Sequence, residues 1–315
     1  MKHKGKILVG SAFTFTLTGI MFVGNYFYSE SIKRGSIVEL HREKSLINTD
    51  KTENESVLKE AKKLYQNINP DRVTMASYDD LILKADYIEN NNKSDKAVIL
   101  MHGFRKQRVD MGNYVKYYLD RGFNILMPDA RGHGESEGNY YGYGWHDRLD
   151  MLKWIDYLVN KETMNHIILH GNSAGAATVL MTSGEKLTKQ VKGIIADSGF
   201  TSMNDELKHQ LKNLYGIPSF PLLKLTSVIT KIRAGYYFSE VTALEQVKKN
   251  KLPLFIIHGD ADELVPTEMS KLIYKAANVD NKRLWIVPET GHIKAYETET
   301  IEFEKRLDDF LTTLF

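Results

Sequence analysis

The stretch that most constrains this chain runs from His166 to Met181, HIILHGNSAGAATVLM. Its first five residues, 166–170, form an apolar, β-branched run of strand length. The chain then passes through GNSAG (171–175) and continues with small and apolar residues at helical spacing. A Gly-flanked serine between a strand and a helix is typical of a nucleophile elbow, where the serine adopts strained backbone angles and flanking glycines prevent clashes. The pattern predicts that Ser173 is held out at the carboxyl end of a strand, although an ordinary strand-to-helix turn would look similar.

The composition excludes several classes of protein. The 315 residues can bury one large core or two modest ones, and they include no cysteine. Disulfides, thiolate catalysis, cysteine metal sites and a lipid-modified N-terminal cysteine are therefore excluded. Residues 1–28 hold three lysines and no acid, which leaves 39 basic and 40 acidic residues in the remainder. A body with almost no net charge gives no electrostatic case for nucleic-acid binding.

Near the N-terminus, residues 7–28 contain no charged side chain and follow a short basic stub. As a helix, these 22 residues would extend ~33 Å, enough for a hydrocarbon core of ~30 Å. The aromatic residues 26–28 suit a membrane interface. We therefore expect an N-terminal transmembrane helix within an anchor segment, residues 1–34. A cleaved secretory signal is the alternative, but the apolar run is long for that role and Ser29-Glu30-Ser31 is a poor cleavage site.

The orientation of this anchor follows from weaker signals. Three lysines precede the apolar run and four basic residues follow it closely, so the positive-inside rule does not decide. The order of basic stub and then apolar run is that of an export signal. It favours a single-pass protein of the cell membrane whose body lies outside the cytoplasm, with secretion after cleavage as the alternative.

The remaining chain divides into a linker and a body. Residues 35–72 are polar and charge-rich, with one amphipathic helix expected over 55–66. Residues 73–315 alternate apolar runs with helical patterns, which predicts a mainly parallel sheet covered on both faces by helices. In such α/β folds the chemistry lies beyond the carboxyl ends of the strands. Expected strands begin near residues 73, 81, 96, 124, 166, 193, 253 and 283, and expected helices cover 110–121, 146–160, 174–186, 268–277 and 297–314.

One stretch breaks this alternation. More than fifty residues separate the strand that ends at Asp197 from the strand that starts at Pro253. They contain three helical patterns, over 203–215, 222–234 and 240–249. An excursion of that size from the sheet predicts a helical cap over the site, at about 201–250.

A serine nucleophile needs a base within hydrogen-bond reach and a carboxylate that orients the base. Asp262, in the loop GDADELVP (259–266), is the favoured acid, with Asp260, Glu263 and Asp197 as competitors. His292, inside Thr290-Gly291-His292 after the last expected strand, is the favoured base, whereas His258 is expected to be a packing residue. The chain order Ser173, Asp262, His292 is the order expected for a triad on such a sheet.

The oxyanion of an acyl-transfer reaction needs preorganised donors. We expect the backbone N–H groups of Ala174, directly after the nucleophile, and of Phe104, in the loop after KAVILMHG. Residues 129–136 (DARGHGES) are expected to form a charged loop network beside the site, with Asp129 and Arg131 ion-paired to each other or to neighbours. Three of the remaining side chains, His133, His146 and Asp147, lack recognisable metal-ligand spacing, so no metal site is predicted. The aromatic residues of 140–145 could line an acyl pocket or simply pack.

From about Val73 to the C-terminus, these motifs resemble the α/β-hydrolase superfamily, and most closely the membrane-anchored or secreted serine hydrolases of bacterial cell surfaces. The matching motifs are HGF (102–104), DARGHGES (129–136), GNSAG (171–175), GDADELVP (259–266) and TGH (290–292). The resemblance implies an eight-stranded, mostly parallel sheet with a helical cap, Ser173 as nucleophile, His292 as base and Asp262 as orienting acid. Many relatives carry a bulkier residue at Ala174, which changes the pocket more than the mechanism.

The expected function is hydrolysis of carboxylic esters, of EC class 3.1.1, through a Ser–His–Asp triad and an acyl-enzyme, with no cofactor. The expected partners are a small acyl-ester substrate and the membrane, and the sequence leaves the oligomeric state open. A serine peptidase or a thioesterase could use the same triad, because specificity depends on the cap and pocket. A non-catalytic binding protein on a hydrolase scaffold would be expected to lack part of the triad, and all three members are present.

Overall fold

The computed structural model describes residues 21–35 and 52–315. Its centre is one eight-stranded sheet in the order β1-β2-β4-β3-β5-β6-β7-β8. The two edge pairs β1–β2 and β2–β4 are antiparallel, and all other pairs are parallel. The expected eight-stranded, mostly parallel sheet is confirmed. The strands are β1 (Asp71–Ala76), β2 (Ile82–Ile88), β3 (Lys96–Met101), β4 (Asn124–Pro128), β5 (His166–Asn172), β6 (Val191–Asp197), β7 (Leu254–Gly259) and β8 (Lys282–Val287).

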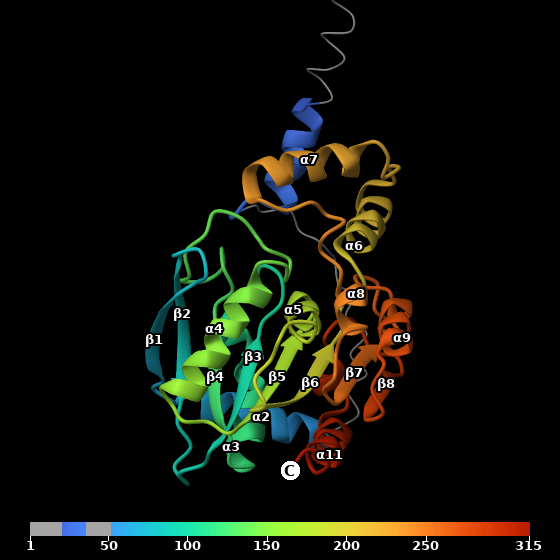
Figure 1. The fold of residues 1–315 in the computed structure, drawn as a ribbon. Coiled ribbons are helices and arrows are strands. Elements are labelled where there is room, and N and C mark those ends of the chain that lie inside the picture. Colours follow the sequence, from blue (N-terminus) through green and yellow to red (C-terminus); the bar gives the residue numbers. More distant parts are fainter. Residues whose placement is uncertain (1–20, 36–51) are drawn as a thin grey trace, which may run out of the picture.

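Helices cover both faces of this sheet, as the alternation of apolar runs predicts (Figure 1). The central strands are continuous apolar runs because both of their faces are buried. One core cluster includes side chains of α4 (Asp147–Asn160), α5 (Ala174–Thr182), α8 (Ala243–Val247) and α9 (Thr267–Ala276). The other includes side chains of η1 (Arg108–Tyr114), α3 (Val115–Asp120), α10 (Ala295–Thr298) and α11 (Thr300–Leu311).

The excursion between β6 and β7 forms a cap at the carboxyl ends of the strands (Figure 1). It comprises α6 (Met203–Gln210), a π-helical turn η2 (Leu211–Tyr215), α7 (Leu222–Ala234) and α8. Ser202 caps the start of α6 by accepting a hydrogen bond from the Asp205 N–H, and Gly235 ends α7 in the left-handed conformation. These three helical patterns were predicted, with α8 shorter than expected.

The amphipathic helix expected in the linker exists and packs against the body. It is α2 (Thr52–Gln66), and its Leu58 joins the core cluster that contains α3 and α11. The Asn54 side chain donates to the carbonyl oxygen of Thr298 at 2.9 Å. Gly112 lies so close to the Tyr65 ring that a Cβ there would come within 2.3 Å of it. The polar segment before Val73 therefore contributes packing that its composition did not indicate.

The predicted transmembrane helix falls only partly within the described residues. Residues 7–20 lie outside them, and residues 21–31 form a helix that packs across α7. Gly24 approaches Leu225 so closely that a Cβ would lie 2.7 Å from its side chain, and Arg233 donates to the Asn25 side chain at 2.6 Å. Within the described ranges, no helix has the length and apolar character to cross a bilayer. Residues 21–28 thus contact the cap, which hydropathy alone did not predict.

Candidate active site

Ser173 lies at the turn between β5 and α5, with φ of 56° and ψ of −117°. The strained angles follow from the abrupt change from strand to helix. Both flanking glycines are required by close approaches. A Cβ at Gly171 would lie 2.2 Å from the Gly175 carbonyl oxygen, and a Cβ at Gly175 would lie 2.1 Å from that of Met101. The local sequence GNSAG therefore permits the only backbone path that holds the serine at the base of the cap.

The structure brings together the three side chains expected from the sequence. His292 Nε2 lies 2.8 Å from Ser173 Oγ, and His292 Nδ1 lies 2.7 Å from Asp262 Oδ2. Ser173 comes from the β5–α5 turn, Asp262 follows β7, and His292 follows β8. Because these parallel strands end at the same edge of the sheet, residues 119 positions apart in the chain become hydrogen-bond neighbours.

Asp262 accepts hydrogen bonds from three groups and also contacts His258, whose Nε2 lies 2.9 Å from the Val265 carbonyl oxygen as well. Its Oδ1 accepts from the backbone N–H groups of Leu264 and Val265, at 3.0 and 2.8 Å. Its Oδ2 faces both His292 and the buried His258, whose Nε2 lies 3.0 Å away. Burial alone would raise the pKa of Asp262, but the contacts with His258 and His292 hold it below its usual range. Asp262 is therefore ionised at neutral pH.

His258 was expected to be only a packing residue, and the structure places it on the carboxylate of Asp262. Its other nitrogen, Nδ1, lies 2.6 Å from Ser270 Oγ on α9. The spacing of four residues between His258 and Asp262, across the tight turn after β7, was the available signal. Of the competing acids, Asp197 is buried and bonded to Ser198 Oγ at 2.8 Å, and burial raises its pKa to about 6.

The two residues expected to form the oxyanion hole line the same pocket as Ser173. Phe104 follows Gly103, which lies so near Ser173 that a Cβ would approach its Cβ to 3.3 Å. The Ala130 N–H donates to His102 Nε2 at 3.0 Å, so the proton of His102 is assigned to Nδ1, which donates to the Gly103 carbonyl at 2.8 Å. This bond fixes the peptide unit whose N–H belongs to Phe104.

Replacing His102 by alanine is expected to lower kcat by ~10- to 100-fold with little change in KM, because the Phe104 N–H would lose its fixed direction. The unpaired Ala130 N–H should also cost ~1–3 kcal/mol of stability. Steady-state kinetics and urea unfolding of the full chain measure both effects. A variant that loses stability and keeps its kcat would show that His102 only supports the fold.

The charged loop after β4 forms ion pairs with neighbours and not within itself. Arg131 is fully buried and pairs with Asp150 at 2.7 Å and with Asp79 at 2.9 Å. Asp129 pairs with Arg108 on η1 and accepts from the Glu135 N–H at 2.8 Å. This network braces the loop beside His102. Across residues 21–35 and 52–315, no group of His, Asp and Glu side chains could hold a metal ion.

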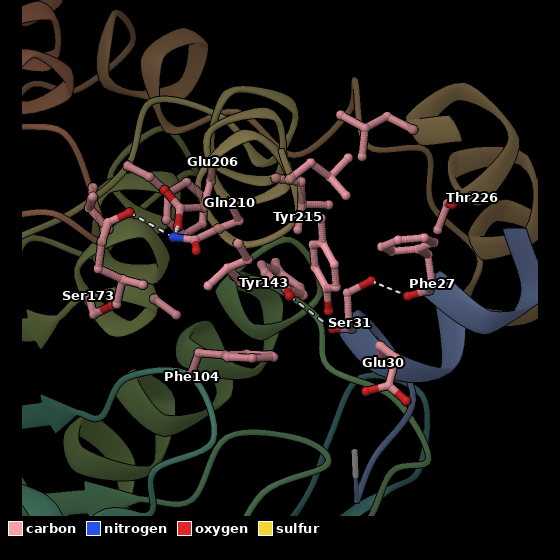
Figure 2. A pocket seen from close by; sticks show the side chains of 18 residues that line it. Phe27, Glu30, Ser31, Phe104, Tyr143, Ser173, Glu206, Gln210, Tyr215 and Thr226 are labelled. Carbon is pink, nitrogen blue, oxygen red and sulfur yellow. Dashed lines mark hydrogen bonds between the residues drawn. The ribbon is translucent and has the colours of Figure 1, made fainter. Parts of the chain in front are cut away.

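A pocket of about 860 Å³, partly open to solvent, extends from Ser173 between the cap and helix 21–31 (Figure 2). Its walls are mostly apolar. They are formed by the loop that carries Phe104 and by α6, η2 and α7. Helix 21–31 adds Phe27, Glu30 and Ser31 to this wall, a contribution absent from the sequence prediction. Of the aromatic residues in 140–145, only Tyr143 lines the pocket, and it donates to the Ser31 carbonyl at 2.9 Å.

Glu206 is the buried acid of this pocket. Gln210 Nε2 donates to its Oε1 at 2.9 Å, while its buried Oε2 has no hydrogen-bond partner. Burial, reinforced by the nearby charge of Asp262, raises the pKa of Glu206 to about 8. The carboxyl is therefore mainly protonated at pH 7, so Glu206 adds little charge to the pocket beside Ser173.

Replacing Glu206 by glutamine is expected to raise stability at pH 8 and not at pH 4. The unfolded carboxyl ionises near pH 4.3, so the native protein loses stability as pH rises from there to the folded pKa of about 8. The neutral amide removes this loss, which corresponds to ~2–4 kcal/mol at pH 8. Urea unfolding of both proteins at the two pH values gives the difference. An equal difference at both values would contradict a raised pKa.

A Gly-flanked serine, a histidine and an aspartate in this order, on a sheet of this topology, define a serine hydrolase of the α/β-hydrolase class. Comparison with known proteins narrows the class. Residues 109–315 match the sequence model of the prolyl oligopeptidase family, Peptidase_S9. The match covers more than half of the chain, and the chain belongs to this family.

The chain is also similar to individual proteins. The uncharacterized protein YqkD of Bacillus subtilis is 30% identical over 219 residues, which are 69% of this chain and 72% of YqkD. A carboxylesterase of Bacillus subtilis is 22% identical over 248 residues, covering 70% of this chain and 94% of the relative. The solved structure of the Pyrococcus furiosus esterase Pf2001 is 26% identical, with a TM-score of 0.65 over 80% of this chain and 95% of the esterase.

Proposed function

We propose that this chain is a membrane-tethered esterase that cleaves carboxylic esters through an acyl-enzyme at Ser173. The observation that carries the proposal is the continuous hydrogen-bonded line from Ser173 Oγ through His292 to Asp262, at the base of an apolar pocket. No step of this chemistry requires a cofactor.

Acylation begins when Ser173 Oγ attacks the ester carbonyl and its proton passes to His292 Nε2. The ionised Asp262 holds the proton of His292 on Nδ1, so that Nε2 is free to accept, and it stabilises the imidazolium that forms. The N–H groups of Phe104 and Ala174 receive the negative charge on the carbonyl oxygen. Collapse of the tetrahedral intermediate breaks the ester C–O bond, and His292 donates its Nε2 proton to the departing alkoxide.

Deacylation repeats these steps with water. His292 takes a proton from the water as the water oxygen attacks the acyl-enzyme carbonyl. Collapse then breaks the bond to Ser173 Oγ, which takes the proton back from His292 and releases the carboxylic acid. The substrate's acyl chain would lie along the apolar wall from Phe104 to Phe27, where the neutral Glu206 adds no charge.

An ester is favoured over a peptide by the apolar character of this pocket and by the similarity of the chain to a carboxylesterase and an esterase. The family match keeps peptide hydrolysis as the second candidate, because a peptidase would use the same three side chains. The described pocket wall presents mostly apolar side chains, which suit a hydrocarbon chain better than a polar peptide backbone.

The tether is the uncharged run 7–28, with the catalytic body outside the cytoplasm. Its last turns lie in helix 21–31, which packs on α7 and leaves the side chains of Met21 and Phe22 exposed. An uncharged run that ends in exposed apolar residues beside the cap supports attachment to a bilayer.

Hydrolysis of nitrophenyl esters of increasing acyl length by the full chain tests the activity. A clear optimum in acyl length is expected, because the pocket has finite depth. A serine-reactive phosphonate should label Ser173 in the same preparation. Labelling without ester turnover would overturn the esterase assignment, and peptide substrates would then be compared. No labelling at all would indicate a binding protein without catalytic activity.

A further inference from the structure

Exposed apolar side chains gather at one end of the molecule. Of the eighteen large hydrophobic residues that are exposed within the described chain, eleven lie in 21–26 and 214–237, although these two segments are a small part of the chain. They belong to helix 21–31, η2, α7 and adjoining loops, which lie together at the end remote from α11 (Figure 1). Such a concentration marks an interaction surface.

The outer face of α7 is both apolar and basic. Val228 and Ile232, one turn apart, are exposed beside Lys224, and Ile232 is 79% exposed. Before the helix, Phe220 is 74% exposed. Leu222, Thr226 and Thr230 point inward and are buried. We call Phe220, Val228 and Ile232, together with Met21 and Phe22 of helix 21–31, the cap face.

Basic side chains predominate around the cap face, although Lys231 pairs with Glu240 at 3.1 Å and Glu30 lies on helix 21–31. Residues 211–235 contain Lys212, Lys224, Lys231 and Arg233 and no acidic residue, although the chain as a whole is nearly balanced. A helix with exposed apolar residues and basic neighbours is typical of one that lies in the interface of an anionic bilayer.

The length of the proposed tether agrees with a position of α7 at the bilayer interface. A bilayer core takes about 20 residues of helix, and that count from Ile7 reaches Tyr26. Gly24 contacts Leu225 and Ile229 of α7. In the proposed tether this contact falls near the C-terminal end of the uncharged run, so α7 would lie at the boundary between hydrocarbon and water.

The pocket reaches the surface next to the cap face. Leu214 and Tyr215 of η2 line the pocket and are also exposed to solvent. The Tyr215 ring packs against Phe27 of helix 21–31, with 5.4 Å between centroids. Tyr215 and Phe27 thus form an apolar part of the pocket wall, with Glu30 also lining the pocket on this side (Figure 2).

We propose that the cap face rests on an anionic lipid bilayer, so that the pocket opening at Tyr215 faces the acyl chains of membrane lipids. This inference rests on the proposed tether, and it makes the substrate a membrane-resident acyl ester. The apolar side chains of the cap face leave water and enter the hydrocarbon of the bilayer. The basic residues around them contact anionic headgroups.

The sequence contains no cysteine, so a thiol-reactive fluorophore would label only the position at which a cysteine is introduced. Full-length Phe220→Cys and Ile232→Cys would carry an environment-sensitive fluorophore in vesicles of phosphatidylcholine and 30% phosphatidylglycerol with doxyl-labelled lipid. Leu272→Cys and Ile301→Cys are matched controls, at 44% and 43% exposure on α9 and α11. Doxyl lipid is expected to quench the two cap probes several-fold more than the controls. Equal quenching at all four sites would overturn the proposal.

Two further readouts separate this inference from the proposed function. Retention of the chain on vesicles in alkaline carbonate reports the tether, and phosphonate labelling of Ser173 reports the catalytic site. A retained, labelled chain with unquenched cap probes would reject the cap face alone. A chain released from the vesicles would reject both the tether and the cap face and leave the esterase assignment standing.

Discussion

Replacing Ser173 by alanine is expected to lower kcat/KM for esters by ~10⁴- to 10⁶-fold, because loss of a triad nucleophile leaves only the contributions of substrate binding and the oxyanion hole. The effect should fall almost wholly on kcat, since the pocket walls are unchanged. Residual turnover would reflect water attack assisted by His292. Single-turnover and steady-state assays on the full chain measure the loss, and phosphonate labelling should disappear with it.

Ser183→Ala is a matched control on the same helix. The Ser183 hydroxyl is buried, whereas Ser173 is half-buried, and it donates to the Leu180 carbonyl at 2.7 Å, at the end of α5 opposite Ser173. Removal of the Ser183 hydroxyl should change kcat/KM less than twofold, although it also removes one side-chain hydrogen bond. If Ser173→Ala retained more than a hundredth of the activity, a different nucleophile would have to carry the reaction.

Much of the fold follows from local patterns in the sequence. All eight strands were predicted because each is a short apolar run that ends in a polar or glycine-containing loop, and buried parallel strands are near-continuous in apolar residues. The cap was predicted from the length of chain between Asp197 and Pro253. The meeting of Ser173, Asp262 and His292 follows from one topological fact, that parallel strands end at a common edge.

Most of the contacts that the sequence did not predict join distant segments. An uncharged run such as 7–28 gives the same hydropathy whether it faces lipid or protein, so the packing of its residues 21–28 on α7 depends on a partner about 200 residues away. The Arg233 bond to Asn25 spans 208 positions. For the same reason, the docking of α2 and the burial of Glu206 in the pocket were not visible in local periodicity.

Replacing Asp262 by asparagine is expected to lower kcat by ~10³- to 10⁴-fold through the tautomer of His292. The N–H groups of Leu264 and Val265 hold the side-chain oxygen at the Oδ1 position, so the amide nitrogen must take the Oδ2 position. A donor would then face His292 Nδ1, which would become an acceptor and move its proton to Nε2. A protonated neutral Nε2 cannot take the proton of Ser173.

The pH profile and a nearby control identify this mechanism. Asp260→Asn changes an exposed carboxylate two residues away and should leave kcat within twofold. In wild type the depressed pKa of Asp262 keeps this carboxylate ionised across the neutral range, so it can hold the tautomer of His292 there. The Asp262→Asn variant should lose activity across the whole range, because no neutral tautomer with a free Nε2 is favoured at any pH. If Asp262→Asn retained a tenth of the wild-type kcat and Asp197→Asn lost its activity, the orienting role would belong to Asp197.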